Sequence, residues 1–555
     1  MASPAPESRA HAPRPPPHGF NSLILLVPAL AFALLVGSIW SHNIDRTTCA
    51  DPSLLSTQTP LLQIETASRS PPVSYNPSSP DSAHHSSIPG RLTAPHPSQP
   101  DTTAVVLNWS RFPNVRRIVA LLCSPELSGT IAQIVVWNNN PIPFSYADFA
   151  LETCPEWKLR IVNSHQNIYF QARFIACSQA NSTYCFFQDD DYLVLPEVLH
   201  AMHTRIVDKQ APTTIYLLPP HERLSSDLRK VYNPDRGLHA SFAWLGHGAL
   251  LHRSRSTDFL SLMNILNATD EELKMADNYF SLLSNSLPET WFDQGIELGG
   301  GQPFTIGLDG EMRNNKHILR AAHFVDSVLL CPDASCPRMV SDVAHPYTLK
   351  DAEPRDTISP THSFGVAPCF GRACVLETTI SLLPRSMWHL SQSAGDLLDI
   401  ERHNAGLLGF KHKKHYTDYP PSHAVDGRPD TVFRSPSNAQ AQDSITLDML
   451  QPLGSHWHQV EMVWLVDTHT KALLRNSVFE SSSDGKSRVW TVSTNSLICS
   501  QVPINIGVFP RFLQECVVGV PESTGARYFR TRLMNDSVEG WSVYEVWMRG
   551  INVQK

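Results

Sequence analysis

The sequence has few charged residues and no excess of positive charge. Only 17% of its 555 residues are Asp, Glu, Lys or Arg, and the formal net charge is −8 at pH 7. A nucleic-acid-binding protein normally presents a basic face that neutralises phosphates, and this balance supplies none. We therefore expect no nucleic-acid partner. The length leaves room for two or more domains.

Several metal and phosphate motifs are also missing. The 11 cysteines include no C-x-x-C pair, which excludes zinc-ribbon spacing. No H-E-x-x-H motif is present, so a metal-dependent hydrolase, a third class that we considered, lacks its best support. The three glycines at 299–301 do not have the spacing of a phosphate-binding loop, and we interpret them as a flexible turn.

Charge is absent from Ser22 to Gly37, near the start of the chain. The apolar segment around it has about the 20 residues that a membrane-spanning helix needs. Arg9 and Arg14 precede it and favour a cytoplasmic N-terminus. A cleaved signal peptide is the alternative, but no small-x-small cleavage site follows. We expect a cytoplasmic tail (1–21) and a transmembrane signal anchor (22–40) of a single-pass type II protein of the Golgi or endoplasmic reticulum membrane.

Aromatic residues are scarce from 41 to 103, where Ser, Pro and Thr dominate. Such a segment cannot bury enough apolar surface to fold, so we expect an extended stem. Beyond the anchor the chain carries N-x-S/T glycosylation motifs and an even number of cysteines outside the stem, which fits a lumen that forms disulfides. The motifs begin at Asn108, Asn181, Asn267 and Asn535, and the close cysteine pairs are Cys331/Cys336, Cys369/Cys374 and Cys499/Cys516.

Strand and helix patterns alternate over residues 104–330. Short apolar runs between turn residues predict strands, and longer runs between them predict helices. This alternation predicts an α/β domain with a mostly parallel sheet. The expected strands lie at 104–107, 131–137, 159–162, 184–195, 214–218 and 242–251, and the expected helices at 115–123, 170–180, 195–207, 258–266 and 271–285.

Three consecutive carboxylates, Asp189, Asp190 and Asp191, interrupt the apolar run from Tyr184 to Leu195. They repel one another unless positive charge lies nearby, and a hard divalent cation such as Mg²⁺ or Mn²⁺ suits carboxylate oxygens. Ligands of open α/β sheets collect at the carboxyl ends of strands. We therefore predict a site for a metal and a diphosphate here. The alternative is a solvated acidic turn, because three-residue motifs recur by chance.

The order of motifs over residues 104–330 resembles the exostosin-type (family 64-like) glycosyltransferase domain. The family's D-D-D strand matches the aspartate triplet, which is its form of the DXD motif. Two departures stand out: Gln171 replaces the first Asn of the helix motif, and Asp277-Asn278 replaces an acid pair. The other matched pieces are Val135–Asn139 (V-V-W-N-N), Gln171–Phe174 (N-x-R-F), Trp244–Ala249 and Ala276–Phe280.

The resemblance implies a GT-A-like nucleotide-diphosphosugar domain that transfers a sugar with retention, using Mn²⁺ (or Mg²⁺) and a UDP-sugar. Asp191 would ligate the metal, and Asp189 and Asp190 would lie next to it, at the ribose and in the layer behind the metal. Asp277 would face the donor sugar as the catalytic residue, with Asp293 and Glu297 as the next candidates. The residues that would lie along the uridine diphosphate are Asn138, Asn139 and Arg173.

A run of basic residues follows the glycine turn. Arg313, Lys316 and His317 would close over the leaving diphosphate, since a guanidinium matches phosphate oxygens. A solvated basic loop is the equally simple alternative.

The C-terminal part changes character. Residues 331–409 hold two close cysteine pairs and many prolines, and we expect a connector with some strands. From 410 to 555, short alternating strands separated by turns predict an all-β sandwich of the jelly-roll type. This part resembles a discoidin-like (coagulation factor C-type) galactose-binding domain, through Ala424–Thr431, Ser482–Gly485, Ala526–Arg530 and Trp541–Val546. Asp426 and Asp430 suit a structural Ca²⁺, although an Asp-Gly turn needs no metal.

The sequence thus predicts a metal-dependent glycosyltransferase that moves a hexose or N-acetylhexosamine from a UDP-sugar to a glycan or glycoprotein. The alternative is a non-catalytic, membrane-tethered carbohydrate-binding protein with a degenerate transferase domain. Asn278 in place of the second acid and the appended sandwich favour that alternative.

Overall fold

The computed structural model describes residues 85–87, 99–150, 154–208, 214–300, 307–330, 365–384, 387, 390–453, 459–485, 490–506, 509–520 and 525–551. The predicted tail, the predicted anchor, most of the predicted stem and the pair Cys331/Cys336 lie outside these ranges. Within them, no helix combines the length and the apolar character that crossing a membrane requires.

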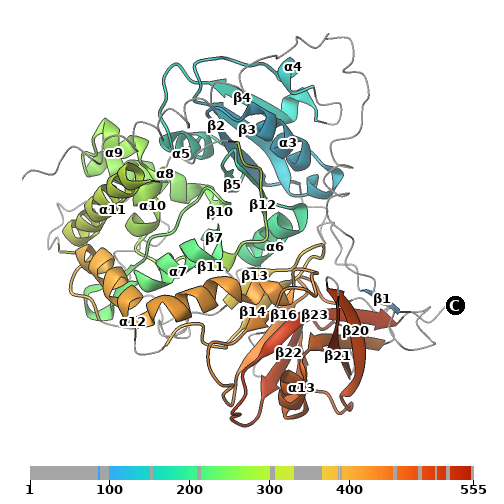
Figure 1. Ribbon diagram of the computed structural model, residues 1–555. Helices are drawn as coiled ribbons and strands as arrows, with labels where there is room; N and C mark the ends of the chain where they lie inside the picture. The colour runs from blue at the N-terminus through green and yellow to red at the C-terminus, as the bar shows by residue number, and fades with distance from the viewer. Residues whose placement is uncertain are drawn as a thin grey trace, which may run out of the picture. The chain divides into compact units, whose positions relative to one another are not determined.

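A seven-stranded sheet is the centre of the N-terminal half of the described chain (Figure 1). Its order is β11-β7-β10-β5-β2-β3-β4, and every neighbouring pair is parallel except the two that involve β10. The predicted mostly parallel sheet is therefore confirmed. The strands are β2 Thr102–Asn108, β3 Ile131–Asn138, β4 Leu159–Asn163, β5 Tyr184–Gln188, β7 Thr214–Leu218, β10 Ala249–His252 and β11 Glu289–Phe292.

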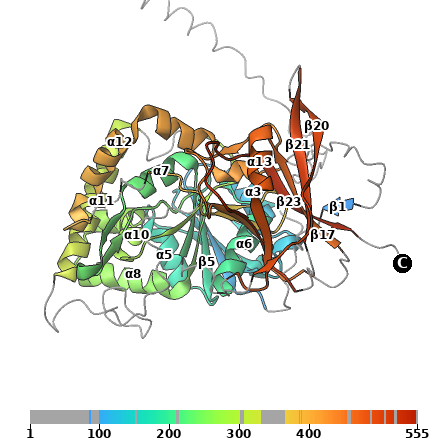
Figure 2. The same ribbon diagram turned by 90° about the horizontal axis from the view of Figure 1, so that it is seen from below.

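Helices cover both faces of this sheet because side chains of its strands alternate between two apolar cores. On β5, Phe187 belongs to one core and Phe186 to the other. Figure 2 shows α5 and α6 on opposite sides of β5. The first core is shared with α5 Gln171–Ser178, α8 Arg253–Ile265, α10 Asp277–Leu283 and α11 Leu308–Leu329. The second is shared with α3 Phe112–Leu122 and α6 Pro196–Val207.

Shorter elements complete this half of the chain. Two small antiparallel pairs, β6 with β12 and β8 with β9, lie outside the main sheet. The bounds are α4 Tyr146–Phe149, β6 Tyr192–Leu193, α7 Pro220–Leu228, β8 Val231–Asn233, β9 Leu238–Ala240, α9 Asp270–Lys274 and β12 Ile296–Glu297.

Three local predictions need correction. The expected strand 242–251 is a strand only at its end, because the chain turns at Gly246 and His247 before β10 begins. The expected helix 271–285 is two helices, α9 and α10, that meet at Met275 and Ala276. The basic run 313–317 is not a loop but part of α11.

Two antiparallel sheets form the C-terminal part, and they enclose one apolar core. The predicted all-β architecture is therefore confirmed. One sheet has the order β1-β23-β17-β21-β20 with β15 beside β23, and the other has the order β13-β14-β16-β22-β18-β19. The strands are β1 His85–Ser87, β13 Gly365–Pro368, β14 Val375–Thr378, β15 Phe433–Arg434, β16 Ser444–Asp448, β17 Gln459–Val466, β18 Ser477–Ser482, β19 Thr491–Val492, β20 Ile498–Ile506, β21 Phe509–Val520, β22 Tyr528–Leu533 and β23 Ser542–Ile551.

This β-unit draws strands from segments that the sequence analysis placed elsewhere. β13 and β14 come from the predicted connector, and β1 comes from the predicted stem. Two helices accompany the sheets, α12 Leu397–Asp418 and α13 Thr468–Arg475. The turn around Asp426 is held by hydrogen bonds that the Asp426 carboxylate accepts from Thr431 and from the Arg428 amide, and the structural Ca²⁺ stays a prediction.

Four disulfides join described cysteines. The predicted pairs Cys369–Cys374 and Cys499–Cys516 are confirmed. Cys123–Cys154 and Cys177–Cys185 were not predicted. The last of these ties the end of α5 to the second residue of β5.

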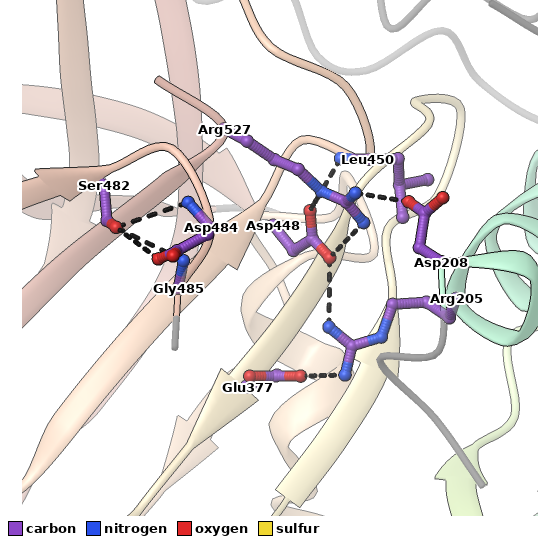
Figure 3. A network of polar contacts seen from close by, with 9 residues as sticks. All are labelled: Arg205, Asp208, Glu377, Asp448, Leu450, Ser482, Asp484, Gly485 and Arg527. Atoms are coloured by element: carbon purple, nitrogen blue, oxygen red, sulfur yellow. Dashed lines mark hydrogen bonds and ion pairs between the residues drawn. The ribbon is translucent and has the colours of Figure 1, made fainter. Parts of the chain in front are cut away.

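A buried ion network connects α6 to the β-unit (Figure 3). Asp448, at the end of β16, accepts hydrogen bonds from Arg205 of α6 (3.0 Å) and from Arg527 (2.6 and 3.0 Å). Arg205 also binds Glu377, and Arg527 also binds Asp208. Because Asp448 is completely buried between two guanidinium groups, it fixes the β-unit against the helix that follows the aspartate triplet.

Candidate functional site

The aspartate triplet lies directly after β5, at the carboxyl end of the central strand. The Asp189 amide donates to the Gly246 carbonyl oxygen at 3.0 Å, which brings the turn before β10 against the triplet. A Cβ at position 246 would lie 2.3 Å from Asp189 Oδ2. Any larger residue at this position would therefore force the Asp189 carboxylate to move, which gives the glycine before His247 a structural reason.

Arg111, at the start of α3, compensates the middle acid. Its Nη1 lies 2.6 Å from Asp190 Oδ1 and 3.3 Å from Asp191 Oδ2. Its Nε donates to the Gly300 carbonyl oxygen at 3.1 Å, so the glycine turn is held against the same guanidinium. The Trp109 amide adds a hydrogen bond to Asp190. Asp190 is thereby fixed by partners of its own, and its position behind a metal stays a prediction.

Arg173, on α5, lies between two acids that are far apart in sequence. Its Nη2 is 2.8 Å from Asp189 Oδ1 and 3.1 Å from Asp277 Oδ2. The guanidinium is completely buried, and the rings of Phe170 and Phe187 lie 5.5 and 5.9 Å from it. The residue predicted to lie along the diphosphate is thus a buried counterion for the triplet and for Asp277.

The charges around the triplet do not cancel. Four acids, Asp277 and the triplet, meet two guanidinium groups, Arg111 and Arg173. Among the triplet, the Asp191 side chain is the most exposed, at 34%. Burial, followed by the Asp189 carboxylate, raises the pKa of Asp191 to about 6. An acid that is short of positive charge and open to solvent is a suitable ligand for a divalent cation.

A second charged group borders the triplet on the side of β10 and β11. His247 Nε2 lies 3.4 Å from Glu222 Oε1 at the start of α7, and His247 Nδ1 lies 3.9 Å from Asp293 Oδ2 after β11. Burial alone would lower the pKa of His247, but the Glu222 hydrogen bond and the nearby carboxylates raise it. The Tyr192 ring packs edge-on against this imidazole, with 4.5 Å between centroids.

Asp293 should make stability depend on pH. Its side chain is 2% exposed, and burial raises its pKa to about 7. The folded protein therefore holds this proton more tightly than the unfolded chain, so stability falls as pH rises from about 4 to about 7 and levels off above. We expect Asp293→Asn to remove a pH-dependent change in the free energy of unfolding on the order of 2–4 kcal/mol, measured by denaturant unfolding between pH 4.5 and 8. Exposed Asp235→Asn is the control, and parallel curves for all three proteins would show that Asp293 titrates normally.

Asn138 and Asn139 organise loops at the ends of β3 and β4. Asn138 is completely buried and donates to Asn163 Oδ1 and to the Ile142 carbonyl oxygen, both at 2.9 Å. Its own Oδ1 accepts from Asn108 at 2.8 Å. Asn139 spans the segment before α5, with a bond to the Tyr169 carbonyl oxygen at 3.2 Å. These amides position the backbone that leads to Arg173, and their predicted contact with the nucleotide stays a prediction.

The basic run on α11 faces α9 and α10. His317 is buried, and its Nδ1 lies 2.8 Å from the Tyr279 hydroxyl. Burial lowers the pKa of His317. Lys316 pairs with Glu271 at 3.0 Å, and Arg313 is half-buried on the same helix. The helix thus ties His317 to the element that begins with Asp277, and the prediction that Arg313 and His317 bind diphosphate stays untested.

Asp277 is the first residue of α10, and its side chain is 2% exposed. Burial raises its pKa to about 7, although Arg173 acts in the opposite direction. One oxygen binds Arg173, and the other is buried without a hydrogen-bond partner. The neighbouring Asn278 amide is also buried with both polar atoms unpaired. The Arg173–Asp277 pair is therefore tied to the triplet, while the catalytic role of Asp277 stays a prediction.

Sequence reasoning missed Arg111, Glu222 and His247. A lone Arg or Glu near a helix start carries no local signal of a site, and Arg111 is 79 residues from Asp190. His247 offered a better signal, since it follows a glycine in a segment that was already matched to a family motif. Among the described residues, no cluster of three or more His, Cys, Asp or Glu side chains is arranged to hold a metal alone.

No protein-family model matches the chain, and none of the curated proteins that were compared matches it either. Solved structures show local likeness. A mannosyltransferase from Pyrobaculum calidifontis, in complex with GDP-Man and Mn²⁺, is 15% identical over 44% of this chain and 68% of its own, with a TM-score of 0.29. S. aureus TarS 1–349 with UDP is 12% identical over 41% of this chain and 71% of its own, with a TM-score of 0.26. The CBM32-1 module of a family 31 glycoside hydrolase from Clostridium perfringens is 17% identical over 24% of this chain and 84% of its own, with a TM-score of 0.18.

Proposed function

We propose that the chain is a metal-dependent glycosyltransferase that uses a UDP-sugar donor and a glycan or glycoprotein acceptor. The observation that carries the proposal is the under-neutralised triplet at the carboxyl end of β5. Two guanidinium groups compensate Asp189 and Asp190, and Asp191 is left as the most exposed acid. The motif order of the exostosin-type domain over residues 104–330 supports the same assignment.

The residues present fit a divalent cation of the Mg²⁺ or Mn²⁺ type. Such ions are often bound by one or two carboxylates together with substrate phosphates and water, so a preformed protein cage is not required. Asp191 would be the protein ligand, with Asp190 held behind it by Arg111. When bound, the cation would neutralise charge on the departing UDP.

The side chains around the triplet would then bind and orient the donor. In the transfer, the bond from the anomeric carbon to the diphosphate oxygen breaks and UDP leaves with its electron pair. A bond to the acceptor hydroxyl oxygen forms, and the departing diphosphate would take up the hydroxyl proton. The resemblance makes this transfer retaining. Asp277 would act on the donor sugar, and Arg173 would keep the Asp277 carboxylate in place. Preorganised charge of this kind contributes most when water is excluded.

The location proposed for this activity is the lumen of the Golgi or endoplasmic reticulum. It is supported by the apolar run Ser22–Gly37 and by the glycosylation motifs beyond it. Four disulfides in the described chain agree with an oxidising compartment.

The metal assignment predicts the effect of Asp191→Asn. With the full chain in detergent micelles, we expect Mn²⁺ to promote UDP binding in the wild type. The variant should weaken that binding by at least about a hundredfold, because the carboxylate ligand is lost. Calorimetric titration of the protein with UDP, in the presence of Mn²⁺ or of EDTA, measures the metal dependence and the effect of the variant. The exposed Asp399→Asn serves as the control. Equal UDP affinity in the variant would remove Asp191 from the site.

Turnover separates the proposed function from its alternative. UDP release from a panel of UDP-sugars should be dependent on Mn²⁺ and on Asp191. If the wild type binds no UDP and releases none from any donor, the chain is better described as a tethered carbohydrate-binding protein.

A further inference from the structure

A hollow of about 80 Å³ lies beside the charged group of His247, between α7 and the segment 242–244. Its walls combine an aromatic side chain with several polar ones. The lining includes Trp244, Phe242, His221, Glu222, Ser225 and Arg229. Trp244 is half-buried, and its ring meets the Phe242 ring edge-on with 4.6 Å between centroids.

Two contacts link the wall of the hollow to the candidate site. Glu222 lines it with one side and contacts His247 at 3.4 Å with the other. Gly246, two residues after the wall segment, has a carbonyl oxygen that accepts from the Asp189 amide. A molecule in the hollow would therefore lie next to the group that borders the triplet.

Two polar atoms of the wall lack a hydrogen-bond partner, Glu222 Oε2 and Arg229 Nε. Glu222 Oε1 faces His247, whereas Glu222 Oε2 is buried without a hydrogen bond. A buried carboxylate oxygen without a donor is costly, so a ligand hydroxyl that donates to it would be stabilising. Arg229 uses its Nη2 for Glu401 at 2.7 Å, and its Nε is buried without a hydrogen-bond partner, so the wall offers a ligand one acceptor and one donor.

We propose that this hollow is the acceptor subsite and that it takes a neutral saccharide. The sugar would pack one apolar face on Trp244 and donate a hydroxyl to Glu222 Oε2. The carboxylate disfavours acidic sugars, since their charge would lie beside it. The assignment of the hollow as an acceptor subsite rests on the proposed function, whereas the binding of a saccharide in it does not.

The test uses the full chain in detergent micelles and saturation-transfer NMR. The probes are the methyl glycosides of galactose, glucose, mannose, xylose, N-acetylglucosamine and glucuronic acid. We expect saturable binding of at least one neutral glycoside and at least tenfold weaker binding of the glucuronide. Trp244→Ala and Glu222→Ala should each lower the affinity for the neutral glycoside by about tenfold, which is about 1.4 kcal/mol of binding free energy. Trp157→Ala, at a tryptophan that is 76% exposed, is the matched control and should change nothing.

A second variant keeps the test valid if the wall variants unfold. Ser225→Trp fills the hollow without removing a wall and should abolish the same binding. If no neutral glycoside saturates, or if binding survives in Trp244→Ala, Glu222→Ala and Ser225→Trp, the inference is overturned. Asp191→Asn should leave glycoside binding intact, so the two proposals fail separately. UDP binding without glycoside binding rejects the subsite, and glycoside binding without UDP binding rejects the transferase.

Discussion

Arg173→Ala is expected to lower the free energy of unfolding by about 3–5 kcal/mol and to abolish metal-dependent UDP binding. The guanidinium is completely buried and compensates Asp189 and Asp277 at 2.8 and 3.1 Å. Without it, two carboxylates at the edge of the triplet lose their counterion. The stability change is measured by denaturant unfolding and the binding by calorimetric titration of UDP.

Two further variants separate charge from shape at this position. A single nitrogen, Nη2, makes both ion pairs, whereas Nε and Nη1 are buried without hydrogen-bond partners. Arg173→Lys should therefore retain much of the stability, because one ammonium can replace one guanidinium nitrogen. Arg173→Met with Asp277→Asn should be more stable than Arg173→Ala, since one buried acid is neutralised. A lysine variant as unstable as the alanine variant would show that packing, not charge, decides the effect.

Asp448→Ala is the second change for which we expect a large effect. It should destabilise the protein by about 3–5 kcal/mol, because it leaves two buried guanidinium groups with one partner fewer. Asp448 accepts four hydrogen bonds, from Arg205, from Arg527 twice and from the Leu450 amide at 2.8 Å. Chemical denaturation of the full chain measures the loss.

The matched control for Asp448 is Arg402→Ala, which removes an ion pair whose side chains are 77% and 79% exposed. Exposed pairs contribute little, so no measurable change is expected. The double variant Arg205→Met with Asp448→Leu should recover part of the stability, since an apolar pair can replace a buried ionic one. Full additivity of the two single changes would contradict the network of Figure 3.

The sheet and the position of the triplet could be predicted because their signals are local. β5 lies inside the sheet, with β2 and β10 as its hydrogen-bonded neighbours, and both of its faces are buried. Its consecutive residues are therefore apolar. Its carboxyl end then follows from the direction of the chain. The all-β part was equally predictable from its alternating strands, but the contribution of β13 and β14 to its sheet was not. β13 pairs with β14, and β14 pairs with β16, which joins segments separated by a long stretch of chain.

The partners of the acids could not be predicted, because they depend on tertiary contacts. Arg111 reaches Asp190 only when β2 and β5 lie side by side. The basic run 313–317 appeared to be a loop because it follows a glycine turn. In the fold, Asn314, His317, Ile318 and Ala321 are all buried at the spacing of one helix face, so packing decides in favour of α11.

The disulfide between Cys177 and Cys185 has a further meaning for the site. Arg173 precedes the first cysteine by about one helical turn, and Asp189 lies shortly after the second, so the cross-link fastens the two arms that carry this ion pair. The loop that it closes is short, and both cysteines are completely buried. The charge balance beside Asp191 is therefore set partly by covalent chemistry that is completed during maturation. A chain that matures under reducing conditions would have to hold its anionic cluster together by packing and by the ion pairs of Arg111 and Arg173, without the cross-link.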